Sequence, residues 1–166
     1  MKLLKGTSIY LRKAEVTDAE LVLSWENMPE FWAISESPGP YELVDMQLTL
    51  QQSYDLVACG QVRWIIFTSA GVPLGLIDLF NYEASSQEAG IGIMIGSKLH
   101  RNQGYGKEAV ALIIQYCRQK KLVRKLKCLI HCDNLASIGL FIHFGFLPKR
   151  QIIYKGKPAI NYELSM

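Results

Sequence analysis

The chain has 166 residues, a length that favours one domain spanning 1–166. With 49% hydrophobic and 20% charged residues, its composition is that of a globular protein and argues against disorder. The net charge of +3 is too small to indicate nucleic acid as a partner, and no apolar stretch approaches the roughly 18–20 residues that span a bilayer. Since the first residues lack the features of a signal peptide, we expect a cytoplasmic protein with free thiols.

Strand and helix patterns can be read along the first half of the chain. Polarity alternates over 9–12, which predicts a first strand. Thr17 and Glu20 fit a capping box that opens a helix, and an irregular aromatic stretch at 28–41 separates it from a second helix expected over 45–54. Three further strands are predicted at 62–68, 73–81 and 88–95.

The second half alternates between helix and strand. Apolar residues recur with a helical period after residue 105, and a strand is expected over 126–131. Asn134 suits the N-cap of a short helix that ends at Gly145, and the last residues read as a hairpin turning at 155–156. This order predicts an α+β (mixed α/β) domain around one central sheet.

The segment 101–106, Arg-Asn-Gln-Gly-Tyr-Gly, lies between a predicted strand and a helix. Two glycines let several backbone N–H groups approach one ligand, and the helix N-terminus adds a positive field. This chemistry favours a phosphate or pyrophosphate. A Walker loop is excluded because Glu108 follows Lys107 where Ser or Thr is needed, and a Rossmann fingerprint fails on its third glycine. By itself, an ordinary strand-to-helix turn explains the segment equally well.

Two longer segments carry a resemblance to a known family. The first, IGIMIGSKLHRNQGYGKEAVALIIQY, is similar to the acetyl-CoA segment of the GNAT superfamily of N-acetyltransferases, whose loop has the form Arg/Gln-x-x-Gly-x-Gly/Ala. The second, DNLASIGLFIHFGF, resembles the superfamily's Asn-x-x-Ser-x-x-Leu-Tyr-x-x-x-Gly-Phe motif. The resemblance covers the chain from about Ile9, and the sequence looks most like the spermidine/diamine and ribosomal-protein N-terminal acetyltransferase branches.

The resemblance implies a GNAT-like fold, a central, mostly antiparallel twisted sheet of about six to seven strands flanked by about four helices. It implies acetyl-CoA as cosubstrate, with Gly92 and Gly96 easing a bulge or close approach beside its path. The pantetheine arm would pair with the backbone of Ile93, Met94 and Ile95. The pyrophosphate would bind to the loop and first helical turn, made of Arg101, Asn102, Gln103, Gly104, Tyr105, Gly106 and Lys107. The pantetheine region would also contact Asn134 and Ser137, although Asn134 could serve only as a helix cap.

Acetyl transfer to an amine requires a base for the amine proton and a donor for the oxyanion. The resemblance implies a backbone N–H as the oxyanion donor, that of Met94 or a neighbour. The family's acid, a tyrosine, is replaced here by Phe141, so the thiolate would leave with help from water. We predict Asp78 as the base, because an acidic residue in an apolar strand is costly unless paired or functional, and a salt bridge explains it equally well. Glu88 is the second choice, with a solvated turn residue as its alternative.

The acceptor site would be lined by the region 25–41, because this part of the fold shapes substrate choice across the family. It offers carboxylates beside aromatic rings, which suit a cationic amine, although the rings could simply belong to the core. The candidates are Glu30, Phe31, Trp32, Glu36 and Tyr41.

The expected reaction is therefore direct transfer of acetyl to a primary amine, a polyamine or related small amine, in a ternary complex. A peptide N-terminus of a (ribosomal) protein as acceptor and a non-catalytic acyl-CoA-binding module are the alternatives. No metal is expected, because strand alternation turns His131 away from Cys128 and Cys132. Homodimers are frequent in the family.

Overall fold

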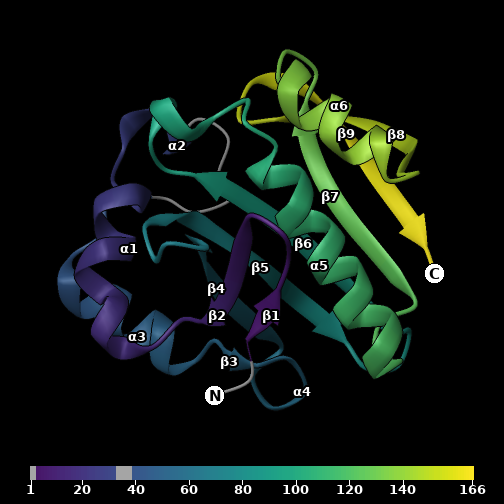
Figure 1. Cartoon of the computed structure of the whole chain (residues 1–166). Coiled ribbons are helices and arrows are strands. Elements are labelled where there is room, and N and C mark those ends of the chain that lie inside the picture. Colours follow the sequence, from purple (N-terminus) through teal and green to yellow (C-terminus); the bar gives the residue numbers. More distant parts are fainter. Residues whose placement is uncertain (1–2, 33–38) are drawn as a thin grey trace.

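The computed structural model describes residues 3–32 and 39–166, which form one twisted sheet flanked by helices (Figure 1). Within these residues, the sheet has nine strands in the order β1-β2-β4-β5-β6-β7-β9-β8, with β3 paired to β4. The strands are β1 Leu4–Lys5, β2 Ile9–Lys13, β3 Tyr54–Asp55, β4 Gln61–Thr68, β5 Pro73–Glu83, β6 Glu88–Ile95, β7 Lys125–His131, β8 Leu147–Tyr154 and β9 Lys157–Ser165. Neighbouring described strands are antiparallel except for β6 and β7, which run parallel.

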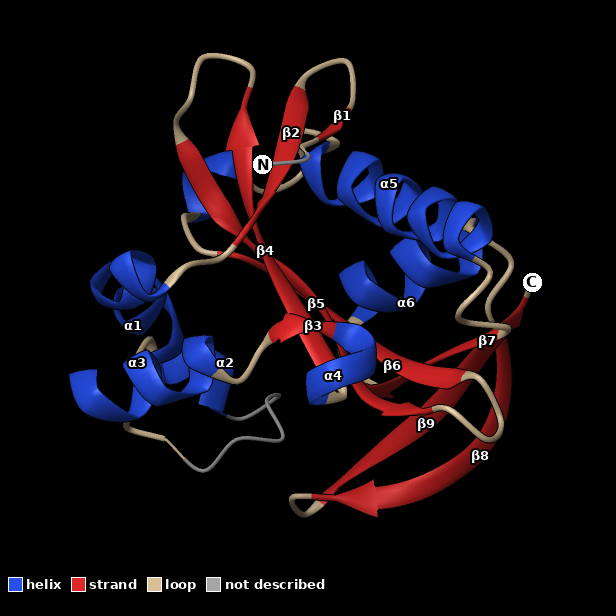
Figure 2. Ribbon diagram, turned by 90° about the horizontal axis from the view of Figure 1, so that it is seen from below, coloured by secondary structure: helices blue, strands red, loops and turns tan. Residues whose placement is uncertain are grey.

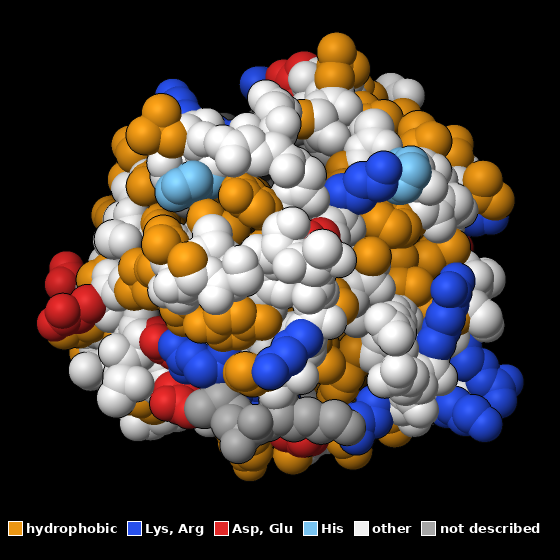
Figure 3. Space-filling view, in the orientation of Figure 1, with side chains coloured by type: hydrophobic (Ala, Val, Ile, Leu, Met, Phe, Trp, Pro, Cys, Tyr) orange, Lys and Arg blue, Asp and Glu red, His pale blue; other side chains and the backbone are white. Residues whose placement is uncertain are grey.

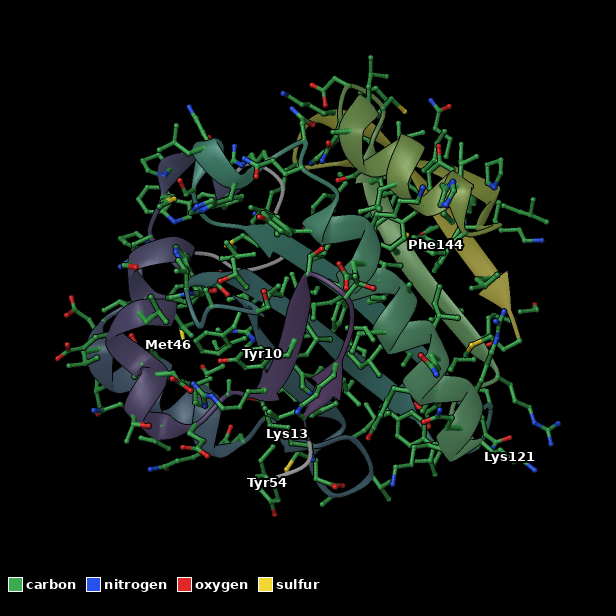
Figure 4. The ribbon with its side chains drawn as sticks, viewed as in Figure 1. Tyr10, Lys13, Met46, Tyr54, Lys121 and Phe144 are labelled. Atoms are coloured by element: carbon green, nitrogen blue, oxygen red, sulfur yellow. The ribbon has the colours of Figure 1, made fainter. Side chains whose placement is uncertain are left out.

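Helices cover both faces of this sheet (Figure 2). The helices are α1 Ala19–Glu26, α2 Pro29–Trp32, α3 Leu43–Gln51, α4 Leu56–Cys59, α5 Tyr105–Lys120 and α6 Leu135–His143, with 3₁₀ turns at Val16–Asp18 and Lys98–His100. One core lies between the sheet and α5 and α6, where the helical residues Ala109, Ile113 and Phe141 pack with strand residues such as Ile91. A second, smaller core lies under α1 and α3 and includes Met46 (Figure 4).

The small strand β3, which pairs with β4, is also joined to the end of β2 by a side chain. Lys13 of β2 donates a hydrogen bond from Nζ to the carbonyl oxygen of Tyr54, at 2.8 Å, and the two residues lie together at the lower edge of the molecule (Figure 4). Lys and Arg side chains gather elsewhere, around the end of α5 (Figure 3), where they oppose the negative end of the helix dipole.

The predicted fold class is confirmed: one mixed, mostly antiparallel sheet with helices. The structure has more strands in the sheet, and more helices around it, than the sequence predicted. The additions include the two-residue strands β1 and β3 and the four-residue helices α2 and α4, which are too short to leave a periodic pattern in the sequence.

Two helix boundaries also differ from the predictions. The capping box at the first helix joins Glu15 and Asp18, not Thr17 and Glu20, and the Glu15 N–H donates to Asp18 Oδ2 at 2.7 Å. The second helix ends at Gln51, three residues before its predicted end. The first difference arises because several Asp, Glu and Thr residues near this boundary are competent caps. The second arises because Tyr54 and Asp55 pair with Val62 and Gln61 of β4 and so leave the helix.

Candidate active site

Strands β6 and β7 diverge after a short paired stretch. They pair only at Glu88–Gly90 with Lys125–Lys127, so the edge of β6 that faces β7 is open from residue 91 to 95. On the other edge, the Gly96 N–H donates to the carbonyl oxygen of Leu74 in β5, at 2.9 Å. A gap that crosses the sheet therefore begins beyond Gly90.

The register decides which backbone groups of β6 face this gap. Residues of an antiparallel pair point alternately toward and away from the partner strand, so Met94, opposite Leu76, points its N–H toward β5 like Gly96. Ile93 and Ile95 then present their backbone groups to the gap, and Ile95 O indeed accepts a bond from Arg101 Nε at 3.1 Å. This register turns the Met94 N–H away from the gap, so of Met94 and its neighbours, Ile93 and Ile95 are the residues whose N–H groups could reach an oxyanion there.

Two clefts meet at the gap. The larger, about 310 Å³, lies on the α1 side and is lined by Glu26, Phe31, Gln61, Arg63, Leu76, Asp78, Phe80, Asn81, Ile91, Gly92, Ile93, Met94 and Leu129. The smaller, about 120 Å³, lies on the α6 side and is lined by Ile91, Gly92, Ile93, Cys128, Leu129, Ile130, His131, Asn134, Ser137 and Phe141. Because Ile91, Gly92, Ile93 and Leu129 border both, molecules bound on opposite faces of the sheet can meet between β6 and β7.

Gly92 and Gly96 allow close approaches to β6, and the register of β6 with β5 runs without a shift from Gly90 to Ile95. A Cβ on Gly92 would lie 2.7 Å from Asp78 Oδ1, and one on Gly96 would lie 2.3 Å from the Trp25 ring. Of the two explanations offered for these glycines, close approach is therefore correct and a bulge is not.

The loop that precedes α5 has the backbone of an anion site. Asn102 and Gly104 have φ values of 59° and 85°, which curl the chain around the helix N-terminus. The first turn leaves the N–H groups of Tyr105, Gly106 and Lys107 without intrahelical partners. The carboxylate of Glu108 is turned away, accepting bonds from the backbone N–H groups of Thr7 and Ser8. The left-handed backbone of Gly104 favours glycine, although nothing lies within 4 Å of its Cβ position.

The arginine and glutamine of this loop use their side chains to hold it. Arg101 reaches Glu30 of α2 at 2.8 Å and lies over the Phe31 ring at 5.3 Å. Gln103 Nε2 donates to the Leu99 carbonyl oxygen. The side chains of Arg101 and Gln103 are thus engaged within the protein, and contact of the loop backbone with a pyrophosphate stays a prediction.

At the start of α6, Asn134 Oδ1 accepts a bond from the Ser137 N–H at 3.3 Å, so Asn134 caps the helix while both residues line the smaller cleft. Phe141 is buried, with its ring edge-on to Phe146 at a centroid distance of 5.0 Å. Cys128 lines the same cleft, but burial raises the pKa of its thiol to about 12, which makes it a poor nucleophile.

Glu26, Asp78 and Arg63 line the larger cleft together and form an acidic cluster. Arg63 Nη2 donates to Asp78 Oδ2 at 2.9 Å, and Arg63 Nη1 donates to Glu26 Oε1 at 3.1 Å. Burial raises the pKa of Glu26 above its ordinary value, and the nearby Arg63 opposes that shift. Asp78 therefore has the salt bridge considered as its alternative explanation, yet it still borders the gap beside Gly92.

Glu88 lies away from this cluster, at the closed end of the gap. Its carboxylate is bound by Lys125 Nζ at 2.7 Å and by Lys127 Nζ, and these bonds lower the pKa of Glu88. Six residues of strand separate it from Met94, a distance of about 20 Å. It lines neither cleft, so the structure does not bring it to the other candidate residues.

Of the residues predicted to bind the acceptor, Phe31 lines the larger cleft. Glu30 is bound by Arg101 and, at 3.5 Å, by Lys98. Trp32 Nε1 donates to the Glu26 carbonyl oxygen at 2.9 Å, and the Tyr41 backbone is bound on both sides by the Asn27 amide. Glu36 lies outside the described residues.

The chain matches the family model described as an acetyltransferase (GNAT) domain over residues 8–147. It belongs to the GNAT acetyltransferases. The probable N-acetyltransferase YjcK of Bacillus subtilis (strain 168) is a relative of this GNAT enzyme, 31% identical over 151 residues, which cover 87% of this chain and 83% of that protein. The family resemblance inferred from the two motifs and the enzyme class, an N-acetyltransferase, are thereby confirmed.

Solved structures share the GNAT fold across the whole chain. RimL, the ribosomal L7/L12 alpha-N-protein acetyltransferase in complex with coenzyme A, superposes with a TM-score of 0.85 at 15% identity and covers 99% of this chain and 98% of its own. A spermidine N-acetyltransferase from Vibrio cholerae in complex with CoA and spermine gives 0.85 at 13% identity and covers 96% of both chains. At these identities the likeness concerns the fold.

Sequence reasoning about this GNAT enzyme missed Glu26 and Arg63. Arg63 carried a usable signal, since it is a charged residue within the apolar strand β4, as Asp78 is in β5. Glu26 carried none, because a carboxylate at the end of an amphipathic helix resembles a surface residue. In the parts of the chain that are described, no helix is long and apolar enough to cross a membrane, and no group of three or more potential ligands is placed to hold a metal ion.

Proposed function

We propose that this GNAT enzyme transfers an acetyl group from acetyl-CoA to a primary amine, a polyamine or related small amine, by direct attack in a ternary complex. The observation that carries the proposal is the gap between β6 and β7, bordered by both clefts. Acetyl-CoA would enter from the α5 and α6 side, and the amine would enter from the α1 side. Transfer without a covalent enzyme intermediate needs both substrates in contact, which this geometry supports.

The cosubstrate would be held by backbone groups. The loop 101–106 and the N–H of Lys107 would bind the pyrophosphate, and the open edge at Ile93 and Ile95 would pair with the pantetheine arm. One of these two N–H groups would donate to the oxyanion as the carbonyl carbon becomes tetrahedral. With Phe141 in place of a tyrosine, the thiolate leaves with a proton from the attacking amine or from water, since its pKa of about 8.5 makes it a fair leaving group.

The amine would be recognised by the acidic cluster. Asp78 lies beside Gly92 at the gap, so its carboxylate is the one best placed to contact an ammonium that approaches the acetyl group. Phe31 and Phe80 line the same cleft and add apolar and cation–π contact. A small amine fits the cleft volume, and the names of two related structures, a spermidine and a ribosomal-protein acetyltransferase, mark the two acceptor classes to be compared.

The test is thiol release from acetyl-CoA with a panel of polyamines, amino sugars, amino-acid amides and N-terminal peptides. The Gly104→Glu variant puts bulk and negative charge where the pyrophosphate would bind, so it should abolish both acetyl-CoA binding and turnover. Gly139→Ala is the matched control, because Gly139 has open space around its Cβ position in α6. If intact-mass analysis shows acetyl groups only on a protein N-terminus, the small-amine assignment is wrong.

A binding module without catalysis is the second candidate, favoured by the buried Phe141. It predicts that acetyl-CoA binds tightly, that Gly104→Glu abolishes the binding, and that no amine in the panel is acetylated.

A further inference from the structure

The arrangement around Arg63 separates the roles of the two carboxylates in the larger cleft. We propose that Glu26, at the end of α1, accepts the proton of the acceptor ammonium while Asp78 holds that ammonium beside the gap. The inference rests on the proposed function, because it requires an amine in this cleft.

The acidic cluster has two carboxylates, Glu26 and Asp78, and one guanidinium, Arg63, so it lacks one positive charge. Arg63 is the single guanidinium between the two carboxylates, and no other Lys or Arg lines the cleft within 3–32 and 39–166. Among the same residues, Glu26 Oε2 receives no hydrogen bond. Buried carboxylates require a partner, so an ammonium that donates to Asp78 and Glu26 together completes the cluster.

Burial and position distinguish the two acids. Asp78 is nearest the gap, with Oδ1 2.7 Å from the Cβ position of Gly92, and its Oδ2 accepts a bond from Arg63 at 2.9 Å. The Glu26 side chain is the more buried, 8% exposed against 16% for Asp78, and its bond to Arg63 is the longer. Burial therefore makes a proton easier to accept on Glu26 than on an exposed carboxylate, in agreement with its raised pKa.

The charged or titratable groups that act on Glu26 and its partner Arg63 come from two strands and a loop. Arg63 and Asp78 face Glu26 from β4 and β5, and Tyr41, in the segment before α3, acts on Arg63. Because both carboxylates contact the same guanidinium, an ammonium bound to Asp78 lies beside Glu26. The proton then has a short path to Oε2.

Acetyl transfer begins with deprotonation of the ammonium. An N–H bond of the ammonium breaks, its electron pair stays on nitrogen, and the proton forms an O–H bond on Glu26. The neutral amine forms a C–N bond with the acetyl carbonyl carbon, and the C–S bond breaks with its electron pair on sulfur. A second proton passes from the nitrogen to the thiolate, leaving a neutral amide and a free thiol, and Glu26 returns its proton to water.

The decisive experiment is the pH dependence of kcat in Glu26→Gln and Asp78→Asn, each with the best amine found in the panel. Gln keeps an oxygen for Arg63 but cannot take a proton, so kcat at neutral pH should fall about 100-fold. The decline of kcat at acidic pH, the acidic limb of the pH profile, should disappear. Acetyl-CoA affinity should be unchanged. Asp78→Asn should raise the acceptor KM and keep the acidic limb. Glu26→Asp, which remains ionisable, should also keep the limb.

Two results would overturn the assignment. One is a Glu26→Gln enzyme with kcat within about threefold of wild type and the acidic limb intact. The other is loss of the acidic limb of the pH profile in Asp78→Asn, which would make Asp78 the base. This second result does not depend on whether a Glu26 variant folds. A wild-type protein that binds acetyl-CoA and acetylates no amine overturns the proposed function together with this inference, so the two failures are distinguishable.

Discussion

At the scale of single residues, the contact between Gly92 and Asp78 decides where the acceptor nitrogen can lie. The Asp78 carboxylate occupies the space that any side chain on residue 92 would need. The small residue on β6 therefore exists because of the acid on β5, and the pair fixes a negative charge at the border of the gap.

Gly92→Ala tests this relation without replacing Asp78 or Glu26. The added Cβ would lie 2.7 Å from Asp78 Oδ1, the end of a flexible side chain, so the protein should fold and the carboxylate should move. We expect the acceptor kcat/KM to fall about tenfold or more, while the affinity for acetyl-CoA changes much less. Steady-state kinetics and calorimetry measure the two quantities. Unchanged acceptor kinetics would show that the position of Asp78 is not important.

The sequence allowed some of these residues to be predicted and concealed others. Asp78 was predictable because an acid in an apolar strand is unusual, and Phe141 because a motif marks its position. Glu26 acquires its significance only when the strands place Arg63 beneath the end of α1, which is a contact between positions 37 residues apart. Such a contact leaves no local pattern.

At the scale of elements, the gap depends on how firmly β6 and β7 are joined at its closed end. Glu88 of β6 binds Lys125 and Lys127 of β7 where the strands still pair, and Lys125 also approaches Glu163 of β9 at 3.9 Å. This charged cluster fastens the two strands side by side at the point from which they diverge.

The pH dependence of stability in Glu88→Gln follows from the lowered pKa of Glu88. A carboxylate with a depressed folded-state pKa stabilises the fold above its unfolded pKa of about 4.3, and that stabilisation is lost as the pH falls through the folded-state value. The variant should melt no more than a few degrees below wild type at pH 7, and the two melting curves should converge in acid. Its kcat should stay within about twofold of wild type, since Glu88 lies far from the clefts. A large loss of kcat would restore Glu88 as a candidate base.

Long elements were predictable and short ones were not. Strands β4, β5 and β6 and helix α5 have enough residues for their periodicity to be read, whereas β1, β3, α2 and α4 do not. The parallel pairing of β6 with β7, and hence the gap, joins strands separated by α5. The motif resemblance implied that the pantetheine arm pairs with this part of β6, which requires an open strand edge there.

At the scale of the whole molecule, one side chain connects the two halves of the site. Arg101 extends from the cosubstrate loop, donates to the carbonyl oxygens of Ile95 and Gly96 at the end of β6, and reaches Glu30 of α2. Its guanidinium also lies over Phe31, which lines the acceptor cleft. The loop proposed to bind pyrophosphate and a wall of the acceptor cleft are therefore joined across the end of the gap.

A double-mutant cycle tests whether this bridge acts as a unit in positioning the acceptor. Glu30→Gln and Arg101→Lys should each lower the acceptor kcat/KM about three- to tenfold, because each loosens the wall that carries Phe31. The double variant should be no worse than the poorer single variant, since both changes remove the same bond. Lys98→Gln is the control: its amino group is 3.5 Å from Glu30 on a side chain that is 77% exposed, so its loss should change kcat/KM less than about twofold. Losses that multiply in the double variant would mean that Arg101 and Glu30 act separately, and the two halves of the site would then be joined only through the sheet.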